Sequence, residues 1–179
     1  MRILAISGSL RRASSNTAVL EAMALLAPDG VDIALHYGLA GLPAFNPDLD
    51  DAAELPAVLA FRDALRAADG VLISSPEYAH GVPGALKNAL DWLVGSGELV
   101  GKPVALINPS PRSLFAHPQL AEILTVMSAD LVAAASITVF VSGRGLDAAG
   151  IAADPELAAA LRQALTHLAA AVAAQRAAA

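Results

Sequence analysis

Short apolar runs alternate with helical patterns along the whole chain, and this alternation constrains the fold more than any other feature. Each run is rich in Val, Ile and Leu and holds few polar residues, which is typical of strands buried on both faces. Such strands belong in a parallel sheet with helices on both faces. The predicted strands are 3–6, 31–35, 71–74, 104–107 and 137–141. The predicted helices are 16–26, 55–68, 84–93, 118–129 and one from 155 into the alanine-rich tail.

Capping residues mark where several of these helices begin. Asn16 is the predicted N-cap of the first helix, and Asp154 followed by Pro155 predicts the N-cap and first residue of the last one. Pro56 and Pro83 are expected at the first position of their helices in the same way. Five strands alternating with five helices predict an α/β fold, a doubly wound sheet of five parallel strands in the flavodoxin-like order 2-1-3-4-5. In this order the loops after the first, third and fourth strands should form a ligand site.

Length and charge exclude several classes of protein. The 179 residues are enough for one domain with a full core, and we expect a single domain over 1–179 whose segment 169–179 is a helix end or tail. The net charge of −6 disfavours nucleic-acid binding, because nucleic-acid-binding proteins cluster Lys and Arg.

No uninterrupted apolar run is long enough to span a membrane, and no secretory signal is apparent, so a cytoplasmic location away from membranes is expected. With no Cys and only scattered His residues, no metal site is predicted.

The first loop, Ser7 to Asn16, predicts a phosphate site. The N–H groups at a helix N-terminus have no partner within the helix and carry partial positive charge, so they bind anions together with hydroxyls and a guanidinium. Ser9, Arg11 and Ser14 supply such side chains. The loop lacks the glycine patterns of dinucleotide sites and P-loops, so the single phosphate of a mononucleotide such as FMN fits better. Helix capping without ligand binding is the alternative.

A second motif follows the third predicted strand, and together the two motifs resemble a known family. The chain reads Ser75-Pro76-Glu77-Tyr78-Ala79-His80-Gly81-Val82-Pro83-Gly84-Ala85-Leu86-Lys87-Asn88. With Ser9-Leu10-Arg11, Ser14 and Asn16, the segments Pro76-Glu77-Tyr78 and Pro83-Gly84-x-Leu86-Lys87-Asn88 resemble the NADPH-dependent FMN reductase family of flavodoxin-like proteins, which includes quinone, chromate and azo-dye reductases. The resemblance covers roughly residues 1–145, and its specificity lies in these two loops.

The resemblance implies a cofactor, a reaction and a set of binding residues. It implies non-covalently bound FMN, NADPH or NADH as electron donor, and ping-pong transfer of hydride through the flavin to a small acceptor: a quinone, free flavin, azo compound or oxidised metal ion. It also implies a homodimer or homotetramer. The residues that it places around the FMN phosphate are Ser9, Arg11, Ser14, Ser15, Asn16 and Thr17. Those that it places near the isoalloxazine ring are Pro76, Glu77, Tyr78, Ala79 and Ser110.

The chain departs from the family pattern at two places. Ala79 and Gly81 stand where the family usually has Asn and Ser, and residues 110–117 replace a loop that often carries a Gly-Gly pair. These departures keep open a flavin-free binding or regulatory domain. A flavodoxin-like electron carrier is another alternative, because loop 37–54 is acidic, with Asp48, Asp50, Asp51 and Glu54. The two motifs argue against that carrier.

Structural roles are predicted for several other polar residues. Flavin N5 accepts hydride without a protein acid, so no catalytic residue is predicted, and His80 is first a pocket-lining or surface residue and only second a group that protonates a quinone. Arg12 is expected to be a solvated charge. The sequence does not show which of Arg11 and Arg12 would bind the FMN phosphate and which the 2′-phosphate of NADPH. Lys87 and Asp91 have the spacing of a helical ion pair. Trp92 is expected in the core or an interface.

Overall fold

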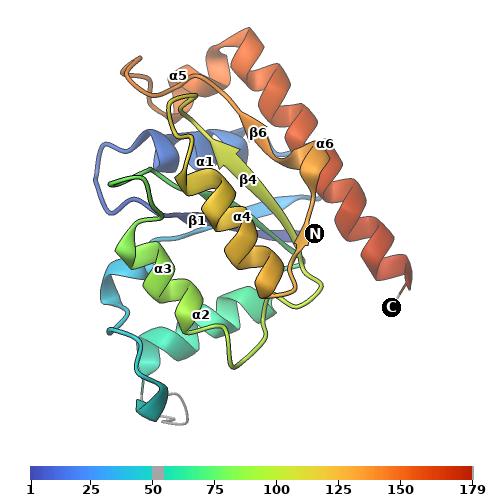
Figure 1. Cartoon of the computed structure of the whole chain (residues 1–179). Coiled ribbons are helices and arrows are strands. Elements are labelled where there is room, and N and C mark those ends of the chain that lie inside the picture. The colour runs from blue at the N-terminus through green and yellow to red at the C-terminus, as the bar shows by residue number, and fades with distance from the viewer. Residues whose placement is uncertain (50–54, 179) are drawn as a thin grey trace.

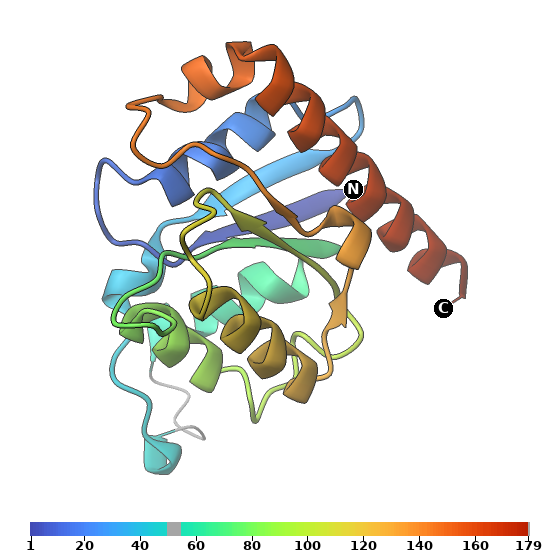
Figure 2. The ribbon, with the colours of Figure 1, turned by 45° about the horizontal axis from the view of Figure 1, so that its top comes forward.

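The predicted parallel sheet is present, with helices on both faces (Figures 1 and 2). The computed structural model describes residues 1–49 and 55–178. The strands are β1 (Arg2–Ser7), β2 (Asp32–His36), β3 (Gly70–Ser74), β4 (Pro103–Asn108), β5 (Asp130–Leu131) and β6 (Ile137–Thr138). The helices are α1 (Ser15–Leu25), α2 (Pro56–Arg66), α3 (Gly84–Asp91), α4 (Ala116–Val126), α5 (Ala148–Ala153) and α6 (Pro155–Ala178).

The strand order β2-β1-β3-β4-β5 confirms the flavodoxin-like prediction. All pairings are parallel, and the register of β1 places Ile6 beside His36 on one side and beside Ile73 on the other. The connection from β2 to β3 therefore passes over β1, and the carboxyl ends of β1, β3 and β4 lie at one edge of the sheet. The loops that follow these three strands meet there.

The two faces of the sheet pack against different helices. Alternate residues of β1 separate cleanly, with Ile3 in the core under α1, α5 and α6 and Leu4 in the core over α2, α3 and α4. Trp92 is fully buried in the second core, as expected for a core residue. Helix α6 is long and apolar enough to cross a membrane by those two criteria alone, but its residues Leu161 and Leu165 are buried in the first core.

The fifth position of the sheet differs from the prediction of one strand at 137–141. Two short segments occupy it, since β5 pairs with the start of β4 and β6 with its end. A single 3-10 turn at Ala133–Ala135 separates them, and the Ser136 hydroxyl oxygen accepts the Leu106 N–H at 3.0 Å where the strand ladder is interrupted. Beyond β6 the Val139 N–H still donates to the Asn108 carbonyl at 2.8 Å. The short helix α5 was not predicted.

Three helix starts differ from the prediction. Ser14, not Asn16, is the N-cap of α1, because Ser14 has extended backbone angles and its side chain accepts the Asn16 N–H. Pro83 is the N-cap of α3 rather than its first residue, and α4 begins two residues earlier than predicted, because a proline such as Pro118 is tolerated in a first turn. Asp154 caps α6 as predicted, its carboxylate accepting the N–H groups of Glu156 and Leu157.

The long connection after β2 is fastened to α3. The side-chain amide of Asn88 donates to the Pro43 carbonyl at 2.8 Å and accepts the Phe45 N–H at 2.8 Å. The Trp92 indole N–H donates to the same Pro43 carbonyl at 2.9 Å. Of the acidic residues expected here, Asp48 is in a 3-10 turn, whereas Asp50, Asp51 and Glu54 lie outside the described residues.

Candidate functional site

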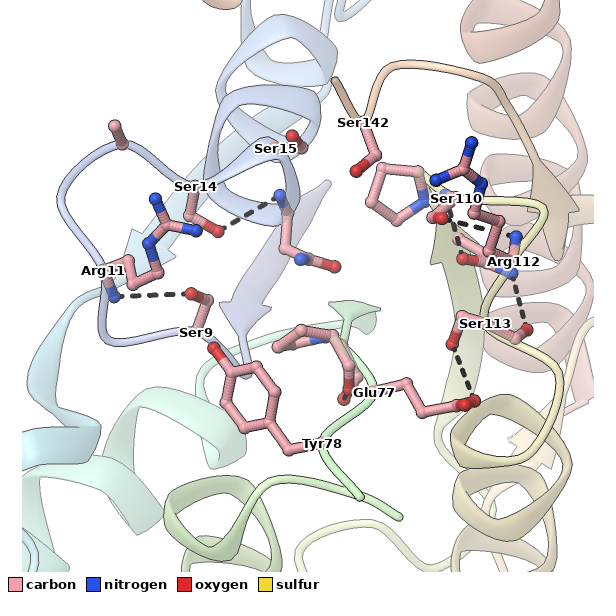
Figure 3. A pocket seen from close by; sticks show the side chains of 16 residues that line it. Ser9, Arg11, Ser14, Ser15, Glu77, Tyr78, Ser110, Arg112, Ser113 and Ser142 are labelled. Atoms are coloured by element: carbon pink, nitrogen blue, oxygen red, sulfur yellow. Dashed lines mark hydrogen bonds between the residues drawn. The ribbon is translucent and has the colours of Figure 1, made fainter. Parts of the chain in front are cut away.

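A cavity of about 300 Å³ lies at the carboxyl edge of the sheet, where the loops after β1, β3 and β4 meet (Figure 3). This volume is at the lower end of the range for ligand clefts, roughly 300–1,000 Å³. The predicted site residues that line it are Ser9, Arg11, Ser14, Ser15, Asn16, Pro76, Glu77, Tyr78 and Ser110. Residues on its wall that the sequence did not indicate are Ala13, Ser75, Asn108, Pro109, Arg112, Ser113 and Ser142. Residues far apart in the sequence thus form one polar cavity.

The first loop wraps its hydroxyl groups around the N-terminus of α1. The Ser9 side-chain oxygen accepts the Arg11 N–H at 3.3 Å, and the Ser14 oxygen accepts the Asn16 N–H at 3.2 Å. Each hydroxyl thereby keeps its own hydrogen for another acceptor. The Ser15 N–H, at the first position of the helix, has no intrahelical partner. This side of the cavity is therefore rich in donors.

Asn16 and Thr17 hold the loop from behind. The Asn16 side-chain oxygen accepts from the hydroxyl of Ser74, the last residue of β3, at 2.9 Å, and both residues are buried. The Thr17 hydroxyl is 2.9 Å from the Ser7 hydroxyl and lines a different cavity. Asn16 thus connects α1 to β3 at the cavity wall, whereas Thr17 is not part of that wall.

Glu77 turns toward the N-terminus of α4 rather than into the centre of the cavity (Figure 3). Its Oε2 accepts the N–H groups of Phe115 at 2.7 Å and Ala116 at 2.9 Å, and the Ser113 hydroxyl at 3.3 Å. The N-cap residue of α4, Phe115, provides no capping side chain, so Glu77 fills this role from another loop. The N–H groups of Ala116 and Phe115 hold the pKa of Glu77 below its ordinary value, helped by the Ser113 hydroxyl. Glu77 is therefore an anion at neutral pH.

The four residues after Glu77 form a tight turn at the rim. Tyr78 and Gly81 exchange two backbone hydrogen bonds of 3.1 and 3.0 Å. Ala79 and His80, between them, have positive φ values of 50° and 60°, the backbone of a type I′ turn. Ala79 is exposed and does not line the cavity. The His80 ring stacks on Phe115 with ring centroids 4.1 Å apart, so this exposed pair joins the second loop to the start of α4.

The loop after β4 is held by its own side chains. Buried Asn108 accepts the Ser110 N–H at 3.1 Å and donates to the Ser113 carbonyl at 3.4 Å. The Ser110 hydroxyl oxygen accepts the Arg112 N–H at 3.3 Å. These bonds place Arg112 on the cavity wall. Asn108 was detectable as the polar end of an apolar strand, but nothing in the local sequence indicated where Arg112 points.

Two curated proteins are similar to this chain in sequence. An NAD(P)H-dependent FMN reductase of Pseudomonas aeruginosa is 41% identical over 112 residues, which are 62% of this chain and 60% of that protein. A quinone reductase of Escherichia coli is 36% identical over 109 residues, 59% of this chain and 58% of that protein. The chain thus covers about three fifths of the length of these curated relatives.

Structural similarity extends over nearly the whole chain. A flavoenzyme NAD(P)H:(acceptor) oxidoreductase from Paracoccus denitrificans, FerB, superposes with a TM-score of 0.75 at 28% identity, covering 97% of both chains. The family model described as NADPH-dependent FMN reductase matches residues 1–143. Because this match takes in most of the chain, including the loops after β1, β3 and β4, the protein belongs to the NADPH-dependent FMN reductase family.

Proposed function

We propose that the protein is an FMN-dependent oxidoreductase that takes electrons from NADPH or NADH and passes them to a small acceptor. A quinone, free flavin, azo compound or oxidised metal ion is such an acceptor. The observation that carries the proposal is the single cavity in which the N-terminus of α1 and Arg11 meet the loops after β3 and β4. The names of two curated relatives, FMN reductase and quinone reductase, support the same class of reaction.

The residues present fit a phosphorylated flavin. The hydroxyls of Ser9 and Ser14 and the Ser15 N–H offer donors at the α1 N-terminus, where the helix dipole favours an anion. Arg11 adds a full positive charge. Gly84, the first residue of α3, is exposed and lines a neighbouring cavity together with Arg11 and Tyr78, and a Cβ added there would meet no protein atom within 4 Å.

The chain binds and orients the reactants while the cofactor supplies the redox chemistry. When bound, FMN provides a ring that accepts and releases a hydride equivalent. Tyr78 and Pro76 form an apolar part of the wall beside that ring, and Glu77 keeps this wall attached to α4. The electron donor and the acceptor use the open side of the cavity in turn, which is a ping-pong mechanism. His80 is not needed as an acid for hydride transfer.

A visible absorption spectrum of the purified protein tests the proposal. The protein is mixed with FMN, filtered to remove unbound flavin, and then mixed with NADPH and separately with NADH. Retained yellow colour that bleaches with a pyridine nucleotide, followed by steady turnover with a quinone, is the expected result. Flavin recovered in the filtrate would contradict it and favour a flavin-free domain. Bleaching without turnover unless a partner protein is added would favour an electron carrier.

A further inference from the structure

A second cavity, of about 350 Å³, lies on the other side of the first loop, between α1 and the carboxyl end of β2. Ser9 and Arg11 line both cavities, whereas Arg12 and Tyr37 line only the second one. Strand β2 is at the edge of the sheet, so this cavity opens to solvent beside the first. A molecule larger than either cavity can therefore reach from one to the other past Arg11.

The charges of the second cavity favour an anion. Arg11 and Arg12 share the lining of this cavity with one carboxylate, that of Glu21, which already accepts the Tyr37 hydroxyl at 3.1 Å. Among residues 1–49 and 55–178, neither arginine forms an ion pair with a carboxylate. Burial lowers the pKa of His36, so this ring on the cavity wall is neutral near pH 7. The local charge is therefore positive, and free guanidinium groups bind phosphates strongly.

Tyr37 gives the same cavity a surface for a flat ring. Its side chain is 69% exposed although it is large and apolar, and its hydroxyl is held by Glu21. An aromatic ring fixed at one end presents a face on which a base can stack. In dinucleotide-binding sheets an acidic residue near this position binds the ribose 2′-hydroxyl of NAD, whereas an arginine accommodates the 2′-phosphate of NADP. Here β2 ends at His36 and Tyr37 follows it, and Arg12 lines the same cavity as both.

We propose that the second cavity binds the 2′-phosphoadenosine end of NADPH, with Arg12 on the 2′-phosphate and Tyr37 beside the adenine. The proposal rests on the proposed function, because it names the donor for the same reaction. It divides the two neighbouring arginines by position: Arg11 serves the first cavity as well as the second, and Arg12 serves the second alone. Arg12 then determines the preference for NADPH over NADH.

Calorimetry with two probes tests the site without turnover. The unmodified protein is titrated with adenosine 2′,5′-bisphosphate and with 5′-AMP, and we expect the bisphosphate to bind at least about tenfold more tightly because of one charge-assisted contact. Arg12→Gln should abolish this difference. Arg162→Gln, which removes an exposed charge on α6, is the matched control and should leave it intact. NADPH should displace the bisphosphate, and FMN should not.

Three outcomes would overturn the proposal. The first is equal affinity for both probes in the unmodified protein. The second is an equal loss of bisphosphate affinity in Arg12→Gln and Arg162→Gln, and the third is displacement of the bisphosphate by FMN. The last would place the anion in the first cavity instead. In turnover, Arg12→Gln should lower the NADPH-to-NADH ratio of kcat/KM by about tenfold. Failure of the proposed function would show separately, as loss of FMN on filtration, because the calorimetry requires no bound flavin.

Discussion

The N-terminus of α1 lines the cavity, and that of α4 lies beside it, beyond Glu77 and Ser113, but only the first is left open. At α1 the capping hydroxyl of Ser14 takes one N–H, that of Asn16, and Ser15 and Asn16 of the first turn line the cavity. At α4 the carboxylate of Glu77 takes the N–H groups of both Phe115 and Ala116. Both helix ends attract anions, so the chain uses its own carboxylate to satisfy one of them. The position left for a phosphate is therefore at α1.

The largest expected effect comes from removing the charge of Arg11, beside the uncapped N–H groups at the N-terminus of α1. Arg11→Gln should weaken FMN binding by roughly 10–100-fold, since a charge-assisted hydrogen bond contributes about 1.5–3 kcal/mol. Riboflavin, which lacks the phosphate, should bind the variant and the unmodified protein equally. Fluorescence titration of both flavins measures this.

Arg112→Gln is the matched variant on the other side of the cavity, in the loop that leads from β4 to α4. It removes the same charge from the same cavity, and we expect a smaller loss of FMN affinity than for Arg11→Gln. A larger loss for Arg112→Gln would show that the phosphate binds on the α4 side and that the comparison of the two helix ends is wrong.

The next effect concerns Glu77, whose carboxylate caps the N-terminus of α4. Glu77→Gln keeps the size of the side chain but removes the charge that accepts three donors. We expect a lower Tm and faster hydrogen exchange at the Phe115 and Ala116 amides. Glu122→Gln, on the exposed face of α4, is the control and should change neither. The link from the Val82 N–H to Gln119 still joins the second loop to α4, so the fold should survive. Unchanged exchange at both amides would contradict the role of Glu77 as a cap.

The effect of Glu77 should depend on pH in a defined direction. Its pKa is lowered in the folded protein, so its contribution to stability is complete above about pH 4.5, its ordinary pKa, and is lost as the pH falls through the folded-state value. The Tm difference between the unmodified protein and Glu77→Gln should thus be constant near neutrality and shrink below that pH. Asp69 and Asp154 also have lowered pKa values, but they are the same in both proteins. A difference that grows on acidification would refute the assignment.

The sequence predicts best what depends on local pattern. Apolar runs identified four strand positions, because burial on both faces leaves little choice of residue type. The strand order was predicted from the alternation of strands and helices. The fifth position was harder, since residues 130–131 are too short a strand to show a pattern and Ser136 replaces a backbone ladder bond by a side-chain one. Alanine-rich segments such as 148–153 carry little periodicity, which is why α5 was missed.

The site was predictable as a set of loops but not in its side-chain directions. Ser9, Arg11 and Ser14 follow from the strand-to-helix connection, which fixes where a helix N-terminus points. Glu77 was expected beside the ring, and its attachment to α4 depends on residues 36 or more positions away in the sequence. Arg112 depends on a loop fixed by Asn108. The residues that hold Glu77 on α4 are too distant in the sequence to leave a local signal.

The smallest expected effect is in the turn that follows Glu77. Ala79 has a positive φ of 50°, which costs a residue with a Cβ about 1–2 kcal/mol relative to the right-handed region and costs glycine almost nothing. Ala79→Gly should raise stability by up to about 1 kcal/mol, the relief being partly offset by the greater entropy of glycine in the unfolded chain. Ala85→Gly, in the first turn of α3, should lower stability by up to about 1 kcal/mol. Chemical denaturation of both variants checks the opposite signs. A loss of stability in Ala79→Gly comparable with that in Ala85→Gly would mean that the turn is not strained at this position.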